Sequence, residues 1–420
     1  MIPQIKQRIE QIRRGEVPEG YKKTKVGIVP ADWQEHKLSH YLTVNNDKNT
    51  DLKYTKDDVF SISGELGIVN QIELLGRSYA GVSVAPYGIV YPNDVVYTKS
   101  PLKANPYGII KTNKLGVTGI VSTLYAIFHC NNNVSPDYVQ LYFESDHNLN
   151  NYLYPIVNIG AKHDMKISDE GSLRGTVVFP PLPEQEKIAE ILQTQDKVIE
   201  LQQKKIDELK RLKKGYLSKM FPKKGCNVPE IRFPGFTDAW EQRKFEEIAV
   251  RSSVICSDAN LPRVEYEDIV SGAGRLNKDI YAKQSSKSGI AFHQGDVLYG
   301  KLRPYLQNWL LPTFDGLAVG DFWVLQPQNA DSSFLYRLIQ SRQFDEVANQ
   351  STGTKMPRAD WKLVSKTVFS IPSYISEQAA IGTYFTALDN LITLHQRKCD
   401  EEKQKKKALM QLLLTGIVRT

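Results

Sequence analysis

The chain has 420 residues, of which 41% are hydrophobic and 24% charged, and its formal net charge is +7. This composition is typical of a soluble protein with more than one domain, and the basic balance favours a polyanionic partner without requiring one. A run of about 18 apolar residues is absent, which argues against a membrane span. The four cysteines form no C-x-x-C pair, so zinc and redox motifs are unsupported and a reduced, cytoplasmic setting is expected.

The N-terminal segment, residues 1–15, predicts a short helix over residues 5–14. Ile5, Ile9 and Ile12 fall on one face of this helix. The segment has charges but lacks the apolar stretch and the small-residue cleavage site of a secretory signal, so we do not expect it to be a signal peptide. Its apolar face could pack on the adjoining domain, on the C-terminal helix or on a partner protein, and the sequence leaves this choice open.

Two regions rich in short strands follow, at residues 16–183 and 226–376. Runs such as SVAPYGIVY, DVVYTK and IVSTLYAIF in the first, and GDVLYG and LAVGDFWVLQP in the second, are rich in β-branched and aromatic residues. Glycine, proline and asparagine separate these runs, which is typical of strands joined by turns. A short helix and a glycine-containing loop are expected near the end of each region.

A long helix is predicted after each region, at residues 184–225 and 377–420. Apolar residues of the first helix recur in steps of three and four and form one stripe. Residues 184–221 would span about 57 Å at 1.5 Å per residue. The second helix has a similar stripe with a polar middle, DEEKQKKK, so we expect it to lie antiparallel against the first. His395 falls on this stripe and is interpreted as a packed histidine, since no second metal-binding residue accompanies it.

The sequence contains an internal repeat, in which one long unit occurs twice. PADWQEHKLSHYL resembles TDAWEQRKFEEIA, NDVVYTK resembles GDVLYGK, and LQQKKIDELKRLKK resembles LHQRKCDEEKQKKK. Trp33 aligns with Trp240 and Glu184 with Glu377, and the offset between the copies shrinks steadily along the chain. The repeated unit is far longer than a solenoid repeat, so each copy is a whole domain with its helix.

The repeat predicts an α+β fold of two mixed, strand-rich domains in tandem, each followed by a long helix. The two helices should pair antiparallel, with internal pseudo-two-fold symmetry. An intermolecular coiled coil holding a homodimer is the simpler alternative. The predicted segments are an N-terminal helix (1–15), a first domain (16–183), a central helix (184–225), a second domain (226–376) and a C-terminal helix (377–420).

Catalytic motifs are not evident. SGAGRLNKD lacks the Gly-Lys-Ser/Thr end of a phosphate-binding loop, and ANPYG lacks the second proline of the Asn-Pro-Pro-Tyr motif of adenine methyltransferases. PEQEK has a carboxylate and a lysine but no second acidic residue for a nuclease metal site. Asp94 and Asp296 recur in both copies after Asn or Gly, so they are interpreted as turn residues. We therefore expect a non-catalytic protein that holds no cofactor and no metal.

Two similar domains joined by a helix pair suggest a reader of two DNA half-sites. A turn of B-DNA is about 34 Å long. The length of the helix pair, reduced by the overlap and tilt of the two helices, is on the same scale. The domains share a frame and differ in their loops, so each should read a different half-site. The expected target is therefore bipartite and asymmetric, with an unread spacer.

Residues kept in both copies should maintain the common fold of the two domains or contact the DNA backbone. Residues that differ between the copies should select bases. Tyr97 and Tyr299 are expected to pack, and Lys99 and Lys301 to contact phosphate. Arg303 could bind guanine through two hydrogen bonds, and Gln307 or Asn308 could pair with adenine. The simpler alternative for Arg303 is a surface ion pair. The candidates for DNA contact are Lys99, Lys103, Lys162, Arg275, Lys301, Arg303, Gln307, Lys355 and Arg358.

Lysines gather towards the ends of both long helices. Two interpretations stay open: they keep the helices soluble, or they form an electrostatic floor under the spacer DNA. The residues concerned are Lys210, Arg211, Lys213, Lys214, Lys403, Lys405, Lys406 and Lys407.

Nearly the whole chain resembles the specificity (S) subunit of type I restriction–modification systems. FPPLPEQEKIAEIL resembles the start of that family's central conserved helix, and GDVLYGKLRPYL resembles a recurrent motif of its target recognition domains. PADWQEHKL and FTDAWEQRKF resemble the openings of those domains, and SIPSYISEQAAIGTYF is a looser second helix start.

The resemblance implies two target recognition domains and a bipartite double-stranded DNA target. It also implies a complex with two methyltransferase (M) subunits and, for cleavage, two translocating nuclease (R) subunits. The M subunits would methylate adenine N6 with S-adenosylmethionine, and the R subunits would use ATP and magnesium. A methylation-only complex, a coiled-coil scaffold and an enzyme with built-in specificity are the alternatives.

Overall fold

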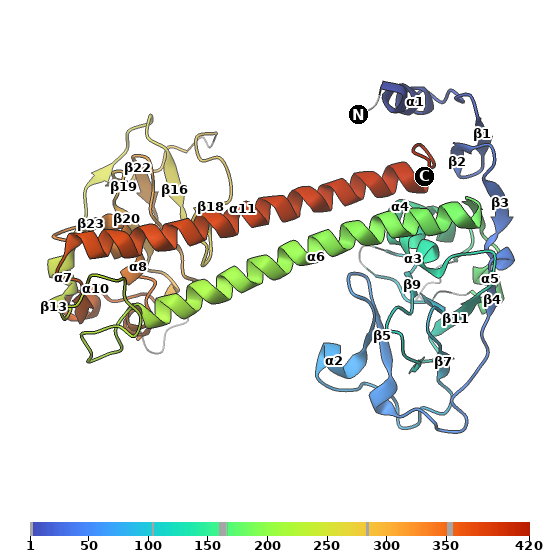
Figure 1. Ribbon diagram of the computed structural model, residues 1–420, viewed down its shortest axis with the longest axis horizontal. Helices are drawn as coiled ribbons and strands as arrows, with labels where there is room; N and C mark the ends of the chain where they lie inside the picture. Colours follow the sequence, from blue (N-terminus) through green and yellow to red (C-terminus); the bar gives the residue numbers. More distant parts are fainter. Residues whose placement is uncertain (1–2, 103–104, 159–164, 166, 283–284, 351–355) are drawn as a thin grey trace. The chain divides into compact units, whose positions relative to one another are not determined.

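The computed structural model describes residues 3–102, 105–158, 165, 167–282, 285–350 and 356–420. The chain divides into two compact units, unit 1 (Met1–Glu200 with Asp400–Thr420) and unit 2 (Leu201–Cys399). Each unit contains strand-rich structure and a part of both long helices, α6 (Leu182–Lys219) and α11 (Ile375–Leu414) (Figure 1). The α+β fold of tandem strand-rich domains with long helices is therefore confirmed.

Unit 1 is built from short antiparallel sheets. Its four-stranded sheet has the order β4 (Leu42–Val44), β11 (Tyr125–Cys130), β8 (Val95–Thr98) and β9 (Ile110–Thr112). Its two-stranded sheets pair β1 (Tyr21–Thr24) with β2 (Gly27–Pro30), β3 (Gln34–Lys37) with β12 (Thr176–Phe179), β5 (Phe60–Ser63) with β6 (Gly67–Asn70), and β7 (Gly88–Val90) with β10 (Gly119–Val121). Its shorter helices are α1 (Pro3–Arg13), α2 (Gln71–Leu75), α3 (Pro136–Glu144), α4 (Asp146–Leu153) and α5 (Asp169–Ser172), with 3-10 turns η1 (Leu38–His40) and η2 (Lys56–Asp58).

The core of unit 1 lies between the four-stranded sheet and α3, α4 and the first turns of α6. Every residue of β8 is buried, because this strand is central in its sheet and is covered on both faces. Ile188 and Leu192 of α6 join Leu413 of α11 in the same cluster as Tyr97. The apolar stripes of both long helices therefore complete the core of this unit.

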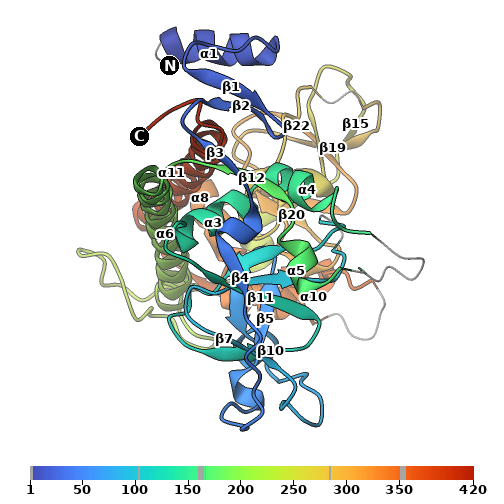
Figure 2. The same ribbon diagram turned by 90° about the vertical axis from the view of Figure 1, so that its right-hand side faces the viewer.

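The N-terminal segment and the C-terminus lie at the same edge of unit 1 (Figure 2). Arg8 of α1 donates from Nη1 to the carbonyl of Ile417 at 2.5 Å, and the hydroxyl of Tyr21 donates to the carbonyl of Gly416 at 2.7 Å. Helix α1 itself has no buried residue. Of the open choices for the N-terminal helix, the structure shows a contact with the segment that follows α11.

Unit 2 repeats this plan, with the two-stranded β7–β10 sheet of unit 1 widened to four strands. Its main four-stranded sheet has the order β14 (Ala249–Ser252), β23 (Phe322–Pro327), β20 (Val297–Gly300) and β21 (Trp309–Leu310). A second sheet has the order β15 (Ile255–Cys256), β19 (Gly289–Phe292), β22 (Gly316–Val319) and β16 (Arg263–Glu265). Two further pairs are β13 (Glu241–Lys244) with β24 (Val368–Ile371) and β17 (Ile269–Val270) with β18 (Arg275–Leu276). Its shorter helices are α7 (Phe245–Ile248), α8 (Ser332–Leu338), α9 (Arg342–Ala348) and α10 (Trp361–Lys366), with 3-10 turns η3 (Tyr266–Asp268) and η4 (Pro304–Leu306).

The main sheets of the two units correspond strand by strand. In sheet order, β14, β23, β20 and β21 match β4, β11, β8 and β9. Tyr299 occupies in β20 the buried position that Tyr97 occupies in β8. The packing role predicted for both tyrosines is confirmed.

In each unit α6 and α11 run antiparallel. In unit 1, Asp196 of α6 contacts Lys406 of α11 at 2.7 Å. In unit 2, Lys213 of α6 contacts Asp389 of α11 at 2.7 Å, and Gln202 accepts from His395 at 2.8 Å. His395 is thus half-buried and hydrogen-bonded to the partner helix, as expected of a packed histidine. Among the described residues, neither long helix is apolar enough to cross a membrane.

Candidate nucleic-acid interface

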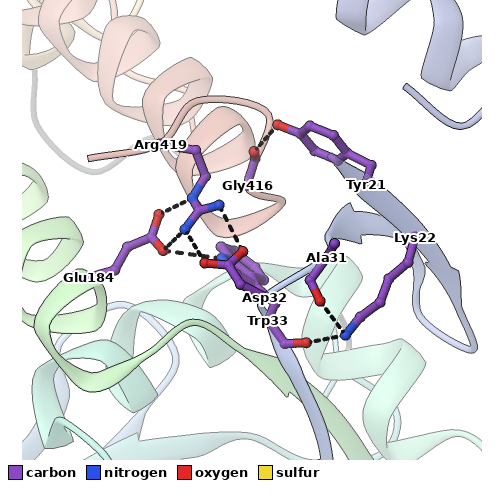
Figure 3. Close-up of polar contacts among 8 residues, drawn as sticks. All are labelled: Tyr21, Lys22, Ala31, Asp32, Trp33, Glu184, Gly416 and Arg419. Carbon is purple, nitrogen blue, oxygen red and sulfur yellow. Dashed lines mark hydrogen bonds and ion pairs between the residues drawn. The ribbon is translucent and has the colours of Figure 1, made fainter. Parts of the chain in front are cut away.

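The first turn of α6 is anchored to the start of unit 1 by an ionic cluster (Figure 3). The buried carboxylate of Glu184 accepts from Trp33 Nε1 at 3.2 Å and from Arg419 Nε at 2.6 Å. Arg419 also donates two hydrogen bonds to Asp32, at 2.9 and 2.7 Å. These bonds hold the pKa of the Asp32 carboxyl below its usual value. One guanidinium therefore ties the C-terminal segment to both the domain and α6.

Unit 2 has the same anchor at the first turn of α11. The carboxylate of Glu377 is fully buried, and it accepts from Trp240 Nε1 at 3.2 Å. Arg232 donates to both of its oxygens, at 2.7 and 2.8 Å, in a bidentate pair that raises the pKa of the arginine. The tryptophans and glutamates of the two anchors align in the sequence. The two arginines do not, because Arg232 follows the end of α6 and Arg419 follows the end of α11 at a different distance.

A glutamine beside each glutamate makes a second matched set of bonds. Gln185 accepts from the backbone N–H of Ser135 at 2.9 Å and donates to the carbonyl of Pro180 at 2.9 Å. Gln378 accepts from the N–H of Asp331 at 2.9 Å and donates to the carbonyl of Pro372 at 2.9 Å. Ser135 and Asp331 are the N-caps of α3 and α8. The Glu-Gln pair therefore fixes the long helix, the strand before it and the helix packed beside it.

Three of the predicted cations of unit 2 come together beside the end of β20. Lys301 and Arg358 both contact Asp321, at 3.5 and 3.1 Å. The backbone N–H of Arg303 donates to the carbonyl of Pro357 at 2.7 Å. Because Lys301 and Arg358 share one carboxylate, a phosphate could engage them only in competition with Asp321.

The loop that begins at Arg303 holds two residues in a conformation rare for non-glycine residues. Arg303 has φ 47° and Gln307 has φ 55°, and they flank η4. Left-handed backbone costs roughly 1–2 kcal/mol per residue, and such strain concentrates at functional sites. Within the described part of the chain, neither side chain has a hydrogen-bond or ion-pair partner, so both are available to a ligand. Asn308 is buried and accepts from Ser271 Oγ at 2.9 Å, so Gln307 is the better placed of the two amides to read a base.

Arg275 belongs to the same surface. It is exposed on β18, and the β17–β18 hairpin is joined to the strained loop by the Gly272 N–H, which donates to the carbonyl of Gln307 at 3.0 Å. Arg275, Lys301, Arg303, Gln307 and Arg358 thus lie on connected segments of one unit.

The candidates in unit 1 are less completely placed. Lys99 forms an ion pair with Asp169, so its ammonium is engaged within the unit. Lys103 and Lys162, like Lys355 of unit 2, lie outside the described residues. Of the predicted DNA contacts of unit 1, the structure therefore describes Lys99. In unit 2 it describes Arg275, Lys301, Arg303, Gln307 and Arg358.

The aspartates kept in both copies have the predicted turn role. Asp94 accepts from the N–H of Tyr91 at 2.8 Å, and Asp296 accepts from the N–H of His293 at 2.9 Å. Each closes the turn before the central strand. In the described residues, histidine, cysteine, aspartate and glutamate form no group able to hold a metal ion.

Neither open interpretation of the helix lysines, solubility or an electrostatic floor under the DNA, fits Lys213. Its side chain is 13% exposed and pairs with Asp389, and burial lowers the pKa of its ammonium. Lys406 is likewise engaged, with Asp196 at 2.7 Å and Glu144 at 3.6 Å. These two lysines hold the helices together because their helical phase points them inwards, while Lys210 and Lys214 remain exposed.

No protein-family model matches the chain. Two curated relatives come from Methanocaldococcus jannaschii. The type I restriction enzyme MjaVIII specificity subunit is 25% identical over 272 residues, a match that covers 58% of this chain and 62% of the relative. A second relative, provisionally named as the MjaX specificity subunit, is 23% identical over 442 residues and the match covers 96% of this chain and 97% of the relative.

Two solved structures share the fold. A chain from a type I restriction–modification complex aligns with a TM-score of 0.55 and 15% identity, over 93% of this chain and 99% of that chain. The S subunit from M. genitalium aligns with a TM-score of 0.52 and 12% identity, over 91% and 96%. In sequence and in fold, the chain therefore resembles the specificity subunits of type I restriction–modification systems, as its motifs predict.

Proposed function

We propose that the chain is the DNA-recognition subunit of a type I restriction–modification complex. The observation that carries this proposal is the surface formed by Arg275, Arg303 and Gln307 on a domain whose frame is duplicated in the chain. Arginine pairs with guanine and glutamine with adenine in the major groove. Lys301 and Arg358 beside them supply positive charge for the phosphate backbone.

The target is bipartite and asymmetric in this proposal. The two units have matched anchors at Glu184 and Glu377, which supports two domains presented in equivalent ways. Their loops differ, which supports two different half-sites. The resemblance supplies the expected partners, two M subunits and two R subunits. Adenine-N6 methylation with S-adenosylmethionine belongs to M, and cleavage with ATP and magnesium belongs to R.

The test is a map of methylated adenines in the DNA of cells that carry this chain with its M subunit, compared with cells that carry M alone. We expect a bipartite motif with a fixed spacer only when the chain is present. Exchange of residues 228–376 for those of a relative should change one half-site and leave the other intact. A complex with M that methylates no defined motif would contradict the proposal and favour a structural scaffold.

A further inference from the structure

Both units place a β-hairpin on a matched support. In unit 1 the backbone N–H of Thr55 donates to Asp58 at 2.7 Å, which closes a capping box around η2. In unit 2 the N–H of Glu265 donates to Asp268 at 2.7 Å around η3. The β5–β6 hairpin follows the first box and the β17–β18 hairpin follows the second. The same local device therefore sets the start of both hairpins.

The far end of each hairpin is pinned by an asparagine. Asn70 donates from Nδ2 to the carbonyl of Asp57 at 2.7 Å, and Asn277 donates from Nδ2 to the carbonyl of Glu267 at 2.7 Å. The turn and second strand read SGELGIVN (residues 63–70) in unit 1 and SGAGRLN (residues 271–277) in unit 2. Ser, Gly, a second Gly and Asn recur in the turn and the second strand, whereas the first strand has 4 residues in unit 1 and 2 in unit 2.

The hairpin tips differ although their supports match. Unit 1 carries Glu65 and Leu66, both exposed, where unit 2 has the single residue Ala273. The hydroxyl of Ser63 accepts from the backbone N–H groups of both tip residues, at 3.3 and 3.1 Å, which fixes the backbone of the tip. The carboxylate of Glu65 has no ion-pair partner within the described ranges.

The second strand of each hairpin differs as well. Unit 2 has the exposed Arg275, and the corresponding residue of unit 1 is the buried Ile68. Arg275 has no hydrogen-bond or ion-pair partner in the described part of unit 2. The tip of its hairpin is bonded to the strained loop through Gly272 and Gln307, so Arg275 and Gln307 are held on one connected surface.

We propose that these hairpins are the elements that make the two half-sites different, with Glu65 and Leu66 selecting bases for unit 1 and Arg275 for unit 2. This inference rests on the proposed function. The support is kept because it sets the distance to the DNA, and the tip changes because it carries the choice of base.

The side chains define the bases expected. Arg275 presents two donors suited to O6 and N7 of guanine. Glu65 can accept from N4 of cytosine, and Leu66 can contact the methyl group of thymine. Unit 1 should therefore read a pyrimidine with its hairpin, and unit 2 should read a guanine.

The experiment uses the full chain in complex with its M subunit and maps methylation on a DNA library in which each position of both half-sites is varied. Arg275→Lys should lower discrimination at one guanine position of one half-site by about 10- to 100-fold. The double variant Glu65→Gln, Leu66→Ala should relax one pyrimidine position of the other half-site. Two matched controls change exposed residues outside the hairpins, Arg342→Lys on α9 and Glu35→Gln on β3, and should leave the motif unchanged.

The results separate the hairpin inference from the proposed function. If both hairpin variants methylate the wild-type motif with wild-type selectivity, the inference is wrong and the proposed function stands. Relaxation of both half-sites by one variant would also overturn it, because each hairpin would then not belong to one half-site. A wild-type complex without any sequence preference would refute the proposed function, and the inference with it.

Discussion

Removal of the anchoring arginines should loosen each unit by a different amount. Arg232 is 13% exposed and its partner Glu377 is 0% exposed, whereas Arg419 is 39% exposed and Glu184 is 7% exposed. Loss of one partner of a buried ion pair costs roughly 3–5 kcal/mol. We expect about 3 kcal/mol for Arg232→Ala, near the lower end because Trp240 still donates to the carboxylate. Solvent screening reduces the expected cost of Arg419→Ala to about 1–2 kcal/mol.

Hydrogen exchange followed by mass spectrometry measures these effects locally. For Arg232→Ala, the peptides around Trp240 should exchange about 100-fold faster by local opening, and those around Trp33 should be unchanged. For Arg419→Ala, the peptides around Trp33 should exchange about 10-fold faster. Arg342→Ala is the control, since this arginine is 84% exposed and its ion pair with Glu346 should contribute little.

The reasoning would be refuted by an equal response to the two substitutions or by no response to either. It would also be refuted if Arg419→Ala accelerated exchange around Trp240 rather than around Trp33. The double variant Arg232→Met, Glu377→Leu gives an independent check. Replacing both charges with apolar groups should restore part of the protection, because it removes the buried carboxylate left without its partner but also leaves the Trp240 Nε1–H without an acceptor.

Three further predictions follow from conformation and burial. Gln307→Gly should raise the thermal midpoint slightly, because it relieves about 0.5–1 kcal/mol of left-handed backbone strain. The same substitution should relax base selectivity. Lowered stability together with unchanged selectivity would contradict a role of Gln307 in base recognition. Burial raises the pKa of the Cys130 thiol to about 12, so iodoacetamide at pH 8 should label the exposed Cys226 much faster than Cys130 in the native protein, with equal labelling after denaturation as the control. Burial raises the pKa of Tyr97 and of Tyr299 well above the ordinary value of a tyrosine hydroxyl, about 10. Their contribution to stability is therefore complete below pH 10 and declines as the pH rises beyond it. Equilibrium denaturation at pH 9 and pH 11 checks this, and equal free energies of unfolding would count against it.

The duplicated frame could be predicted because it depends on residues that recur in order. Trp33 and Trp240 align with little ambiguity, and so do the Glu-Gln pairs that start the long helices. Alternation and turn residues likewise predict the strand-rich class, and a stripe in steps of three and four predicts the helices. These signals are local in sequence and need no knowledge of distant contacts.

The parts that sequence reasoning missed depend on distant contacts or on backbone conformation. Arg419 contacts Asp32 across almost the full length of the chain, and no local pattern marks it. Lys213 belongs to a lysine-rich run, and only the position of Asp389 reveals that it faces inwards. Arg303 and Gln307 adopt positive φ without glycine or asparagine at either position, so their strain has no sequence signal.

The composition of unit 1 has a consequence for synthesis of the protein. Its core is completed by residues 400–420, which are made after the whole of unit 2, and these include Leu413 beside Ile188 and Leu192. Ribosomes add about 5–20 residues per second, so unit 1 waits roughly 10–40 s after Glu200 for its final segment. During that interval the apolar stripe of α6 lacks its partner. Unit 1 therefore begins to emerge before unit 2 but can finish folding only after unit 2 has been made, and its uncovered apolar stripe favours aggregation in the interval.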